Sequence, residues 1–228
     1  MYDRRNNRAI GLFIALAMGL SLSYWGLFIL HDGGLLAFDP AADAMGLLRG
    51  YGPTLAALAT AAVIYGRQGL RDLWARIAMW RISPRLLALA ILGPLLGSLV
   101  LLLIANVAGV DMTPASQSVP IPKLILIFLF FAIADGPIGE EVGWRGFLLP
   151  RLLAAHGSIF ASVLLGLVWF AWHIPLYVAT DKVELDLVFF VSYLLNNVAF
   201  SFIHTWFFLR SGGSALLSIV LHTAGNYS

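Results

Sequence analysis

The chain has 228 residues, of which 60% are hydrophobic and only 11% are charged, and its mean hydropathy is +0.87. This composition excludes an ordinary soluble domain and indicates a polytopic membrane protein. The net charge of +2 is too small to suggest a nucleic-acid partner, and with no cysteine the chain has no disulfide, thiolate metal site or cysteine nucleophile.

Apolar segments recur along the whole chain and predict an all-α fold. We expect about seven transmembrane helices in one helical bundle, a single membrane domain spanning residues 1–228. The last segment is short for a full crossing. The predicted spans are Ala9–Leu30, Gly46–Gly66, Leu86–Val110, Pro122–Leu149, Ser158–Ala179, Leu187–Leu209 and Ser214–Tyr227.

The segment between the second and third spans is less apolar than either of them. Its arginines, Arg71, Arg76 and Arg81, are five residues apart among apolar and tryptophan residues. This pattern predicts a short helix near residues 71–83 that lies at the membrane interface. A polar loop between two spans is the alternative.

Basic and acidic residues alternate between the two ends of the predicted spans. Arginines precede the first span and recur between residues 67 and 85, whereas the intervening loops are acidic. By the positive-inside rule, the N-terminus of this multi-pass protein is cytoplasmic in the cell membrane. The acidic loop residues are Asp32, Asp39, Asp43, Asp111, Asp181, Glu184 and Asp186.

Two adjacent carboxylates, Glu140 and Glu141, lie in apolar sequence with Arg145 close behind. Charges are costly inside a bilayer, so this group is a candidate functional site. On a helix, Glu141 and Arg145 are four residues apart and can pair, while Glu140 points about 100° away. Glu140 is therefore the candidate general base, and Glu141 with Arg145 is supporting structure. The alternative is a helix that leaves the membrane at these charges.

His173 is placed at the same depth as Glu140 by a predicted turn at His156-Gly157. Each residue is 16 positions from the turn, which is about 24 Å along a helix. In an antiparallel hairpin the two side chains would face each other, although Pro150 should kink the first arm. A hydrogen-bonded structural histidine is the alternative for His173.

His222 and Asn226 are four residues apart in the last span and share one face of its helix. Their imidazole and amide groups could donate hydrogen bonds to a developing oxyanion. Alternatively, Glu140, His173 and His222 could supply a His2Glu zinc set, although asparagine is a poor zinc ligand. We assign no role to His31, His156, His204 or the pair Asn196-Asn197.

These residues resemble the three motifs of the CAAX prenyl protease and bacteriocin-processing (CPBP, Abi-type) family of intramembrane proteases. The resemblance covers about Pro122 to the end of the chain, including the segment that begins at Arg210. Trp169 stands where the family usually has phenylalanine, a change expected to affect pocket shape rather than chemistry. The motifs are Glu140-Glu141-x-x-x-Arg145, an aromatic residue four before His173, and His222-x-x-x-Asn226.

The resemblance implies an intramembrane endopeptidase that acts on membrane-associated or prenylated CAAX-type substrates. Its catalytic helices would lie in residues 122–228, after N-terminal helices in residues 1–110. Family members are described as metalloproteases or as metal-free glutamate proteases, and Asn226 favours the metal-free form with no cofactor. A polar cavity should lie between the fourth, fifth and last spans. In the implied roles Glu140 and His173 activate water, Glu141 and Arg145 orient the site, and His222 and Asn226 stabilise the oxyanion.

Two other classes of function remain open from the residues alone. In a non-enzymatic membrane carrier or proton-coupled transporter, Glu140, Glu141 and Arg145 would form a relay. In a haem protein, His173 and His222 would be axial ligands, which leaves the glutamate pair without a purpose.

Overall fold

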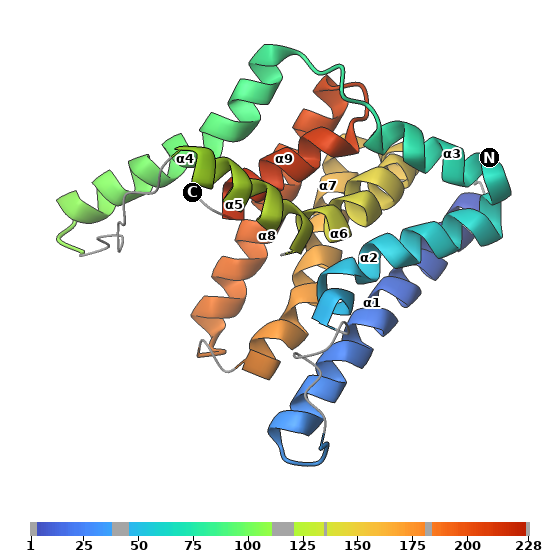
Figure 1. Cartoon of the computed structure of the whole chain (residues 1–228), viewed down its shortest axis with the longest axis horizontal. Helices are drawn as coiled ribbons and strands as arrows, with labels where there is room; N and C mark the ends of the chain where they lie inside the picture. The colour runs from blue at the N-terminus through green and yellow to red at the C-terminus, as the bar shows by residue number, and fades with distance from the viewer. Residues whose placement is uncertain (1–3, 38–45, 111–120, 135, 181–183, 227–228) are drawn as a thin grey trace.

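The computed structural model describes residues 4–37, 46–110, 121–134, 136–180 and 184–226. Every regular element in these residues is a helix, as predicted (Figure 1). The elements are α1 (Arg4–Asp32), α2 (Gly46–Thr60), the π-helix η1 (Ala61–Tyr65), α3 (Gly66–Ile77), α4 (Pro84–Val107), α5 (Ile121–Ala134), α6 (Pro137–Glu141), the π-helix η2 (Val142–Leu148), α7 (Leu149–Thr180), α8 (Leu187–Arg210) and α9 (Ala215–Asn226).

Helices α1 and α2 form an antiparallel pair on one side of the bundle (Figure 1). Small residues on α1, Ala9 and Ala17, are completely buried with Phe13 between them. A Cβ added at Gly52 of α2 would clash with the Ser21 side chain of α1. Small residues at the contact let the two backbones approach closely, which is how helices commonly pack in a membrane.

The predicted interfacial helix begins earlier and ends sooner than its expected bounds of 71–83. Helix α3 is amphipathic, with Leu73 buried and Trp74 exposed. It ends at Ile77. A helix could not have run through residue 83, because Ser83 has the extended φ/ψ of −54° and 129° that a following proline favours.

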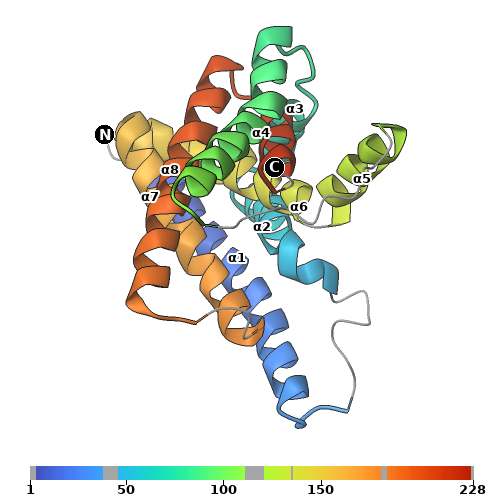
Figure 2. The same ribbon diagram turned by 90° about the vertical axis from the view of Figure 1, so that its left-hand side faces the viewer.

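The prediction of one continuous span over Pro122–Leu149 is wrong. Helix α5 ends at Ala134, and a new helix begins at Pro137 after Gly136, whose φ is +105°. Glycine reaches this conformation without a Cβ clash, and proline is favoured in a first helical turn. Helix α5 projects away from the bundle (Figure 2).

The irregularity expected at Pro150 takes the form of the π-helix η2, which ends two residues before it. Pro150 has no N–H to donate to the preceding turn, and a wider turn accommodates this loss. The predicted break at His156-Gly157 is present within α7, where Gly157 has a φ of +73° and a ψ of 177°.

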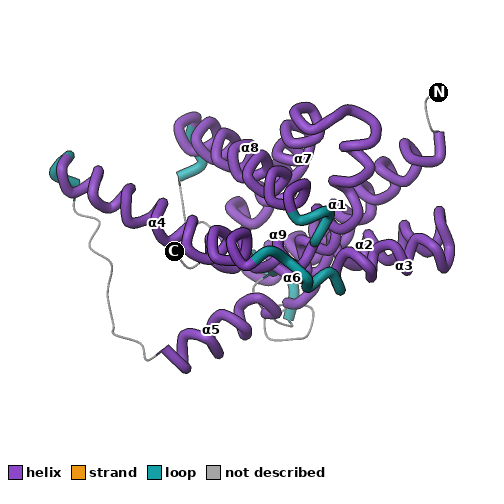
Figure 3. The backbone as a smooth tube through the Cα atoms, turned by 90° about the horizontal axis from the view of Figure 1, so that it is seen from above, coloured by secondary structure: helices purple, strands orange, loops and turns teal. Residues whose placement is uncertain are grey.

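Helix α9 lies among α4, α6 and α8 (Figures 1 and 3). Its start is held by Ser214, whose hydroxyl donates to the Met79 carbonyl at 2.9 Å and accepts from the Leu217 amide at 3.2 Å. This bond ties the segment after α3 to the helix that carries His222.

Four helical stretches in the described residues are long and apolar enough to cross a membrane, and α9 is a shorter apolar helix. They are fewer than the seven predicted spans, because α5 and α9 are short and α2 continues into the polar α3. Helix α4 is almost entirely exposed, with side chains such as Leu96, Leu101 and Ile104 facing outward, as a lipid-facing helix requires. The residues Asp39, Asp43, Asp111, Asp181 and Tyr227, used in the sequence predictions, lie outside the described part.

Candidate functional site

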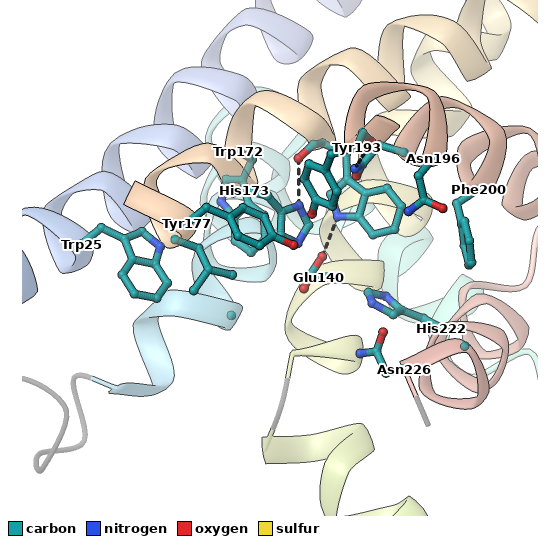
Figure 4. A pocket seen from close by; sticks show the side chains of 15 residues that line it. Trp25, Glu140, Trp172, His173, Tyr177, Tyr193, Asn196, Phe200, His222 and Asn226 are labelled. Atoms are coloured by element: carbon teal, nitrogen blue, oxygen red, sulfur yellow. Dashed lines mark hydrogen bonds between the residues drawn. The ribbon is translucent and has the colours of Figure 1, made fainter. Parts of the chain in front are cut away.

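A cavity of about 460 Å³ lies inside the bundle and is lined by four of the six predicted site residues, Glu140, His173, His222 and Asn226 (Figure 4). Glu141 and Arg145 lie behind them and are fully buried. The structure therefore brings together all six predicted residues, from α6, η2, α7 and α9.

The position of the two glutamates is set by close packing of α6 and η2 on α2. A Cβ at Gly139 would lie 2.5 Å from the Gly50 carbonyl oxygen, and one at Gly143 would lie 2.5 Å from that of Pro53. The Thr54 hydroxyl donates to the Gly139 carbonyl at 2.6 Å. Only glycine at these positions allows the two backbones to touch.

Glu141 is the acceptor at the centre of a buried ion-pair network. Its Oε1 accepts from Arg145 Nη1 at 2.6 Å and from His222 Nδ1 at 2.8 Å. The predicted pair between Glu141 and Arg145 is thus present, and it lies in a site where a carboxylate without a partner would be costly. The contact to His222 was not predicted, because it joins residues 81 positions apart.

Glu140 lines the cavity, and its Oε2 accepts a hydrogen bond of 2.7 Å from the indole Nε1 of Trp169. A Cβ at Gly136 would lie 2.9 Å from Glu140 Oε1. Gly136 therefore leaves the space that this carboxylate oxygen occupies.

The tautomer of His173 follows from its hydrogen bond. Nδ1 lies 2.9 Å from the Trp169 carbonyl oxygen, and a carbonyl only accepts, so Nδ1 carries the proton. In the neutral form of this ring, the lone pair is on Nε2. His173 and Glu140 line the same cavity, in agreement with the depth estimated from the turn.

His222 and Asn226 lie on one face of α9 and both border the cavity (Figure 4). Because Nδ1 of His222 donates to Glu141, only Nε2 of this ring is free to meet a bound molecule. The Asn226 side chain is exposed at the same cavity.

Comparisons with known proteins match a little under half of the chain, the part that carries this site. The Rce1-like family, described as "Type II CAAX prenyl endopeptidase Rce1-like", matches residues 122–228. A curated relative, CAAX prenyl protease 2 of Methanococcus maripaludis, is 28% identical over 113 residues. Residues 122–228 are similar to the CPBP family of CAAX proteases. The match covers 47% of this chain and 39% of the relative, so the chain spans about two fifths of that protein's length.

Trp169, which departs from the phenylalanine usual in this family, has a larger part in the site than the sequence suggested. Its N–H bonds Glu140, a contact beyond the effect on pocket shape that the sequence predicted. Its ring also lies 4.6 Å from the Arg145 guanidinium and 5.5 Å from the rings of both His173 and His222.

Sequence reasoning missed His204, to which it assigned no role. This fully buried residue of α8 has Nδ1 3.7 Å from Glu141 Oε2, and its ring is 6.0 Å from that of His222. Neither ring nitrogen has a hydrogen-bond partner in the described structure. No local pattern could have found it, because α8 carries none of the family motifs.

The cavity is lined by more helices than the fourth, fifth and last spans that were predicted to form it. Helix α8 contributes Tyr193, Asn196 and Asn197, and the N-terminal helices contribute Trp25 and Gly50. The asparagine pair, to which we assigned no role, therefore borders the site.

The zinc set given as an alternative, Glu140, His173 and His222, stays a prediction. In the residues that the structure describes, no three His, Asp or Glu side chains are grouped so as to hold a metal ion. The hydrogen bonds at Glu140 Oε2 and at Nδ1 of His173 and His222 leave Glu140 Oε1 and the Nε2 atom of each ring for a bound molecule.

Proposed function

We propose that this protein is an intramembrane endopeptidase that hydrolyses peptide bonds in membrane-associated or prenylated, CAAX-type substrates without a metal ion. The match of residues 122–228 to the Rce1-like family supports a protease. The observation that carries the proposal is the cavity in which Glu140 and His173 face His222 and Asn226 (Figure 4).

In the proposed reaction, one water binds between the Glu140 carboxylate and the lone pair on His173 Nε2. Glu140 takes a proton from the water as its oxygen attacks the peptide carbonyl carbon. The carbonyl electrons move to the oxygen, and the oxyanion accepts hydrogen bonds from His222 Nε2 and the Asn226 amide. The C–N bond then breaks, and Glu140 returns the proton to the departing amine.

This role requires His222 to be doubly protonated, because Nδ1 donates to Glu141 and Nε2 must also donate. The charges around the ring favour that state. Two carboxylates, Glu140 and Glu141, are balanced by Arg145 alone, and an imidazolium at His222 brings the buried site to neutrality. The buried ion pair thus supports the proposed oxyanion site by keeping His222 charged.

The cavity lining also supports an apolar, lipid-linked substrate. Away from the charged groups it is bordered by aromatic and aliphatic side chains, and the rings of Tyr177 and Tyr193 lie 4.9 Å apart. Such a surface can take up an apolar chain while the polar groups address the peptide bond. The apolar lining consists of Trp25, Trp172, Leu176, Tyr177, Tyr193 and Phe200.

The test is cleavage of a prenylated CAAX peptide by the purified protein in detergent, for the wild type and for Glu140→Gln. Glu184→Gln, at an exposed glutamate outside the cavity, is the matched control. We expect cleavage by the wild type and the control, loss by at least 100-fold in Glu140→Gln, and no effect of exhaustive chelation.

Three outcomes would contradict parts of the proposal. Activity lost on chelation and restored by zinc would make the enzyme a metalloprotease. Equal activity of Glu140→Gln would remove Glu140 as the base. Transport of a solute without any cut peptide would favour the carrier interpretation.

A further inference from the structure

A second cavity, of about 280 Å³, lies at the end of the bundle where α1 begins, and it shares no lining residue with the catalytic cavity. It is formed where α1, η1, α3, η2 and α7 meet. Its lining residues are Asn6, Tyr65, Gly69, Asp72, Leu73, Arg76, Gly146, Phe147, Pro150, Arg151 and Ala154.

Arg151 is held rigidly at this cavity. Its guanidinium carbon lies 3.5 Å from the Phe147 ring centroid and 4.7 Å from that of Tyr65. Its Nη1 donates to the Phe147 carbonyl at 2.6 Å, while its Nε is buried without a hydrogen-bond partner. A buried donor left unpaired is costly, and a bound acceptor would satisfy it.

Arg76 approaches the same cavity from α3. Its guanidinium carbon is 5.6 Å from the Phe208 ring, and a Cβ at Gly213, whose φ is +102°, would lie 2.6 Å from its Nη1. Burial lowers the pKa of Arg76, and the nearby Asp72 carboxylate opposes that shift. The Phe208 ring and the Gly213 backbone therefore restrict the Arg76 side chain to one position.

The cavity carries an excess of positive charge. Two guanidiniums face it against one carboxylate, Asp72, whose Oδ1 accepts from Gln68 Nε2 at 2.7 Å. Like charges that share a partly desolvated site repel each other, and an anion between them would offset that cost. Planar guanidiniums match the oxygen geometry of a phosphate, which makes arginine a common phosphate ligand.

The surroundings favour a lipid as the source of the phosphate. Trp74 and Trp80 are exposed on and just after the amphipathic α3, and tryptophan is typical of the headgroup level of a bilayer. The cavity therefore lies where phosphates of the bilayer are expected. Exposed arginines on the same elements add a favourable field for anionic lipids; they are Arg4, Arg5, Arg8, Arg67 and Arg71.

We propose that Arg76 and Arg151 form a binding site for the phosphate of an anionic phospholipid headgroup. The site is separate from the catalytic groups, and the proposal does not depend on protease activity. It has a structural link to the catalytic helix, because Arg151 bonds the carbonyl of Phe147 in the same π-helix that carries Arg145.

The test is native mass spectrometry of the detergent-purified full chain, titrated with phosphatidylglycerol, with the headgroup-free diacylglycerol of the same chains as reference. Arg76→Gln and Arg151→Gln should each weaken phosphatidylglycerol binding by about tenfold, the loss of one charged hydrogen bond. Arg85→Gln and Arg210→Gln, at exposed arginines outside the cavity, should change it less than twofold. Thermal unfolding of each variant identifies any that fails to fold. If Arg151→Gln does not fold, the comparison of Arg76→Gln with the wild type still tests the proposal.

Equal binding by the cavity variants and the wild type would overturn the proposal. Equal binding of diacylglycerol would also overturn it, because the phosphate would then contribute nothing. A titration with inorganic phosphate distinguishes a site for a lipid headgroup from a site for free phosphate. Phosphate that binds as tightly as the lipid would reject the lipid assignment, whereas weaker competition by phosphate would support it.

Discussion

The indole Nε1 of Trp169 donates a hydrogen bond of 2.7 Å to Oε2 of Glu140, the residue proposed to activate water. The same ring faces the Arg145 guanidinium at 4.6 Å, and Arg145 in turn pairs with Glu141. One aromatic side chain therefore contacts both the cavity-lining glutamate and the buried ion pair. A phenylalanine at this position could keep the ring contacts but could not donate the hydrogen bond.

Trp169→Phe should lower kcat on a prenylated CAAX peptide by about tenfold, because a hydrogen bond to a charged group contributes roughly 1.5–3 kcal/mol. KM should change little, since the substitution leaves the cavity lining aromatic. Steady-state kinetics measure this split. Trp74→Phe, at an exposed tryptophan of α3, is the control. An unchanged kcat in Trp169→Phe would show that the hydrogen bond does not position Glu140 for the reaction.

Glu141→Gln should destabilise the fold much more than Glu140→Gln. Removing the Glu141 charge leaves Arg145 without its buried counterion, and breaking a buried pair costs about 3–5 kcal/mol. Glu140 lines the cavity, where water can compensate its loss. Thermal unfolding in detergent should show a clearly lower Tm for Glu141→Gln alone. Equal Tm values for the two variants would contradict the division of roles between the glutamates.

The relation between Glu141 and Arg145 could be predicted because both residues lie on one helical turn, where a spacing of four decides which side chains meet. The shared depth of Glu140 and His173 was also predictable, since Gly157 marks the break in the helix. Hydropathy alone could not show that residues 122–149 are interrupted, although Gly136-Pro137 is a recognised breaker signal.

What the sequence did not reveal is the set of contacts between distant helices. His222 was expected to meet an oxyanion or, alternatively, a metal, yet one of its nitrogens is bonded to Glu141. His204 and the α8 side of the cavity were missed for the same reason. Such contacts depend on how helices pack against one another, and a local spacing holds no information about that arrangement.

Gly143→Ala should destabilise the protein, because an added Cβ would meet the Pro53 backbone of α2 at 2.5 Å. Overpacking of this kind costs typically about 1–3 kcal/mol and would push η2 away from α2. Gly97→Ala on the exposed helix α4 has open space around its Cβ and should be neutral or slightly stabilising. Thermal unfolding compares the two variants. Equal tolerance of both would mean that this glycine contact does not fix the catalytic helix.

The orientation of the chain can be tested directly, because it contains no cysteine and any introduced thiol is the only reactive one. Asn7→Cys and Leu35→Cys place thiols at exposed positions before and after the apolar part of α1. With a cytoplasmic N-terminus, a membrane-impermeant maleimide added to intact cells should label Leu35→Cys and leave Asn7→Cys unmodified until the cells are lysed. The arginines at residues 4, 5 and 8 should keep that end inside. Labelling of Asn7→Cys in intact cells would reverse the orientation and would place the arginine-lined cavity near α3 at the outer leaflet.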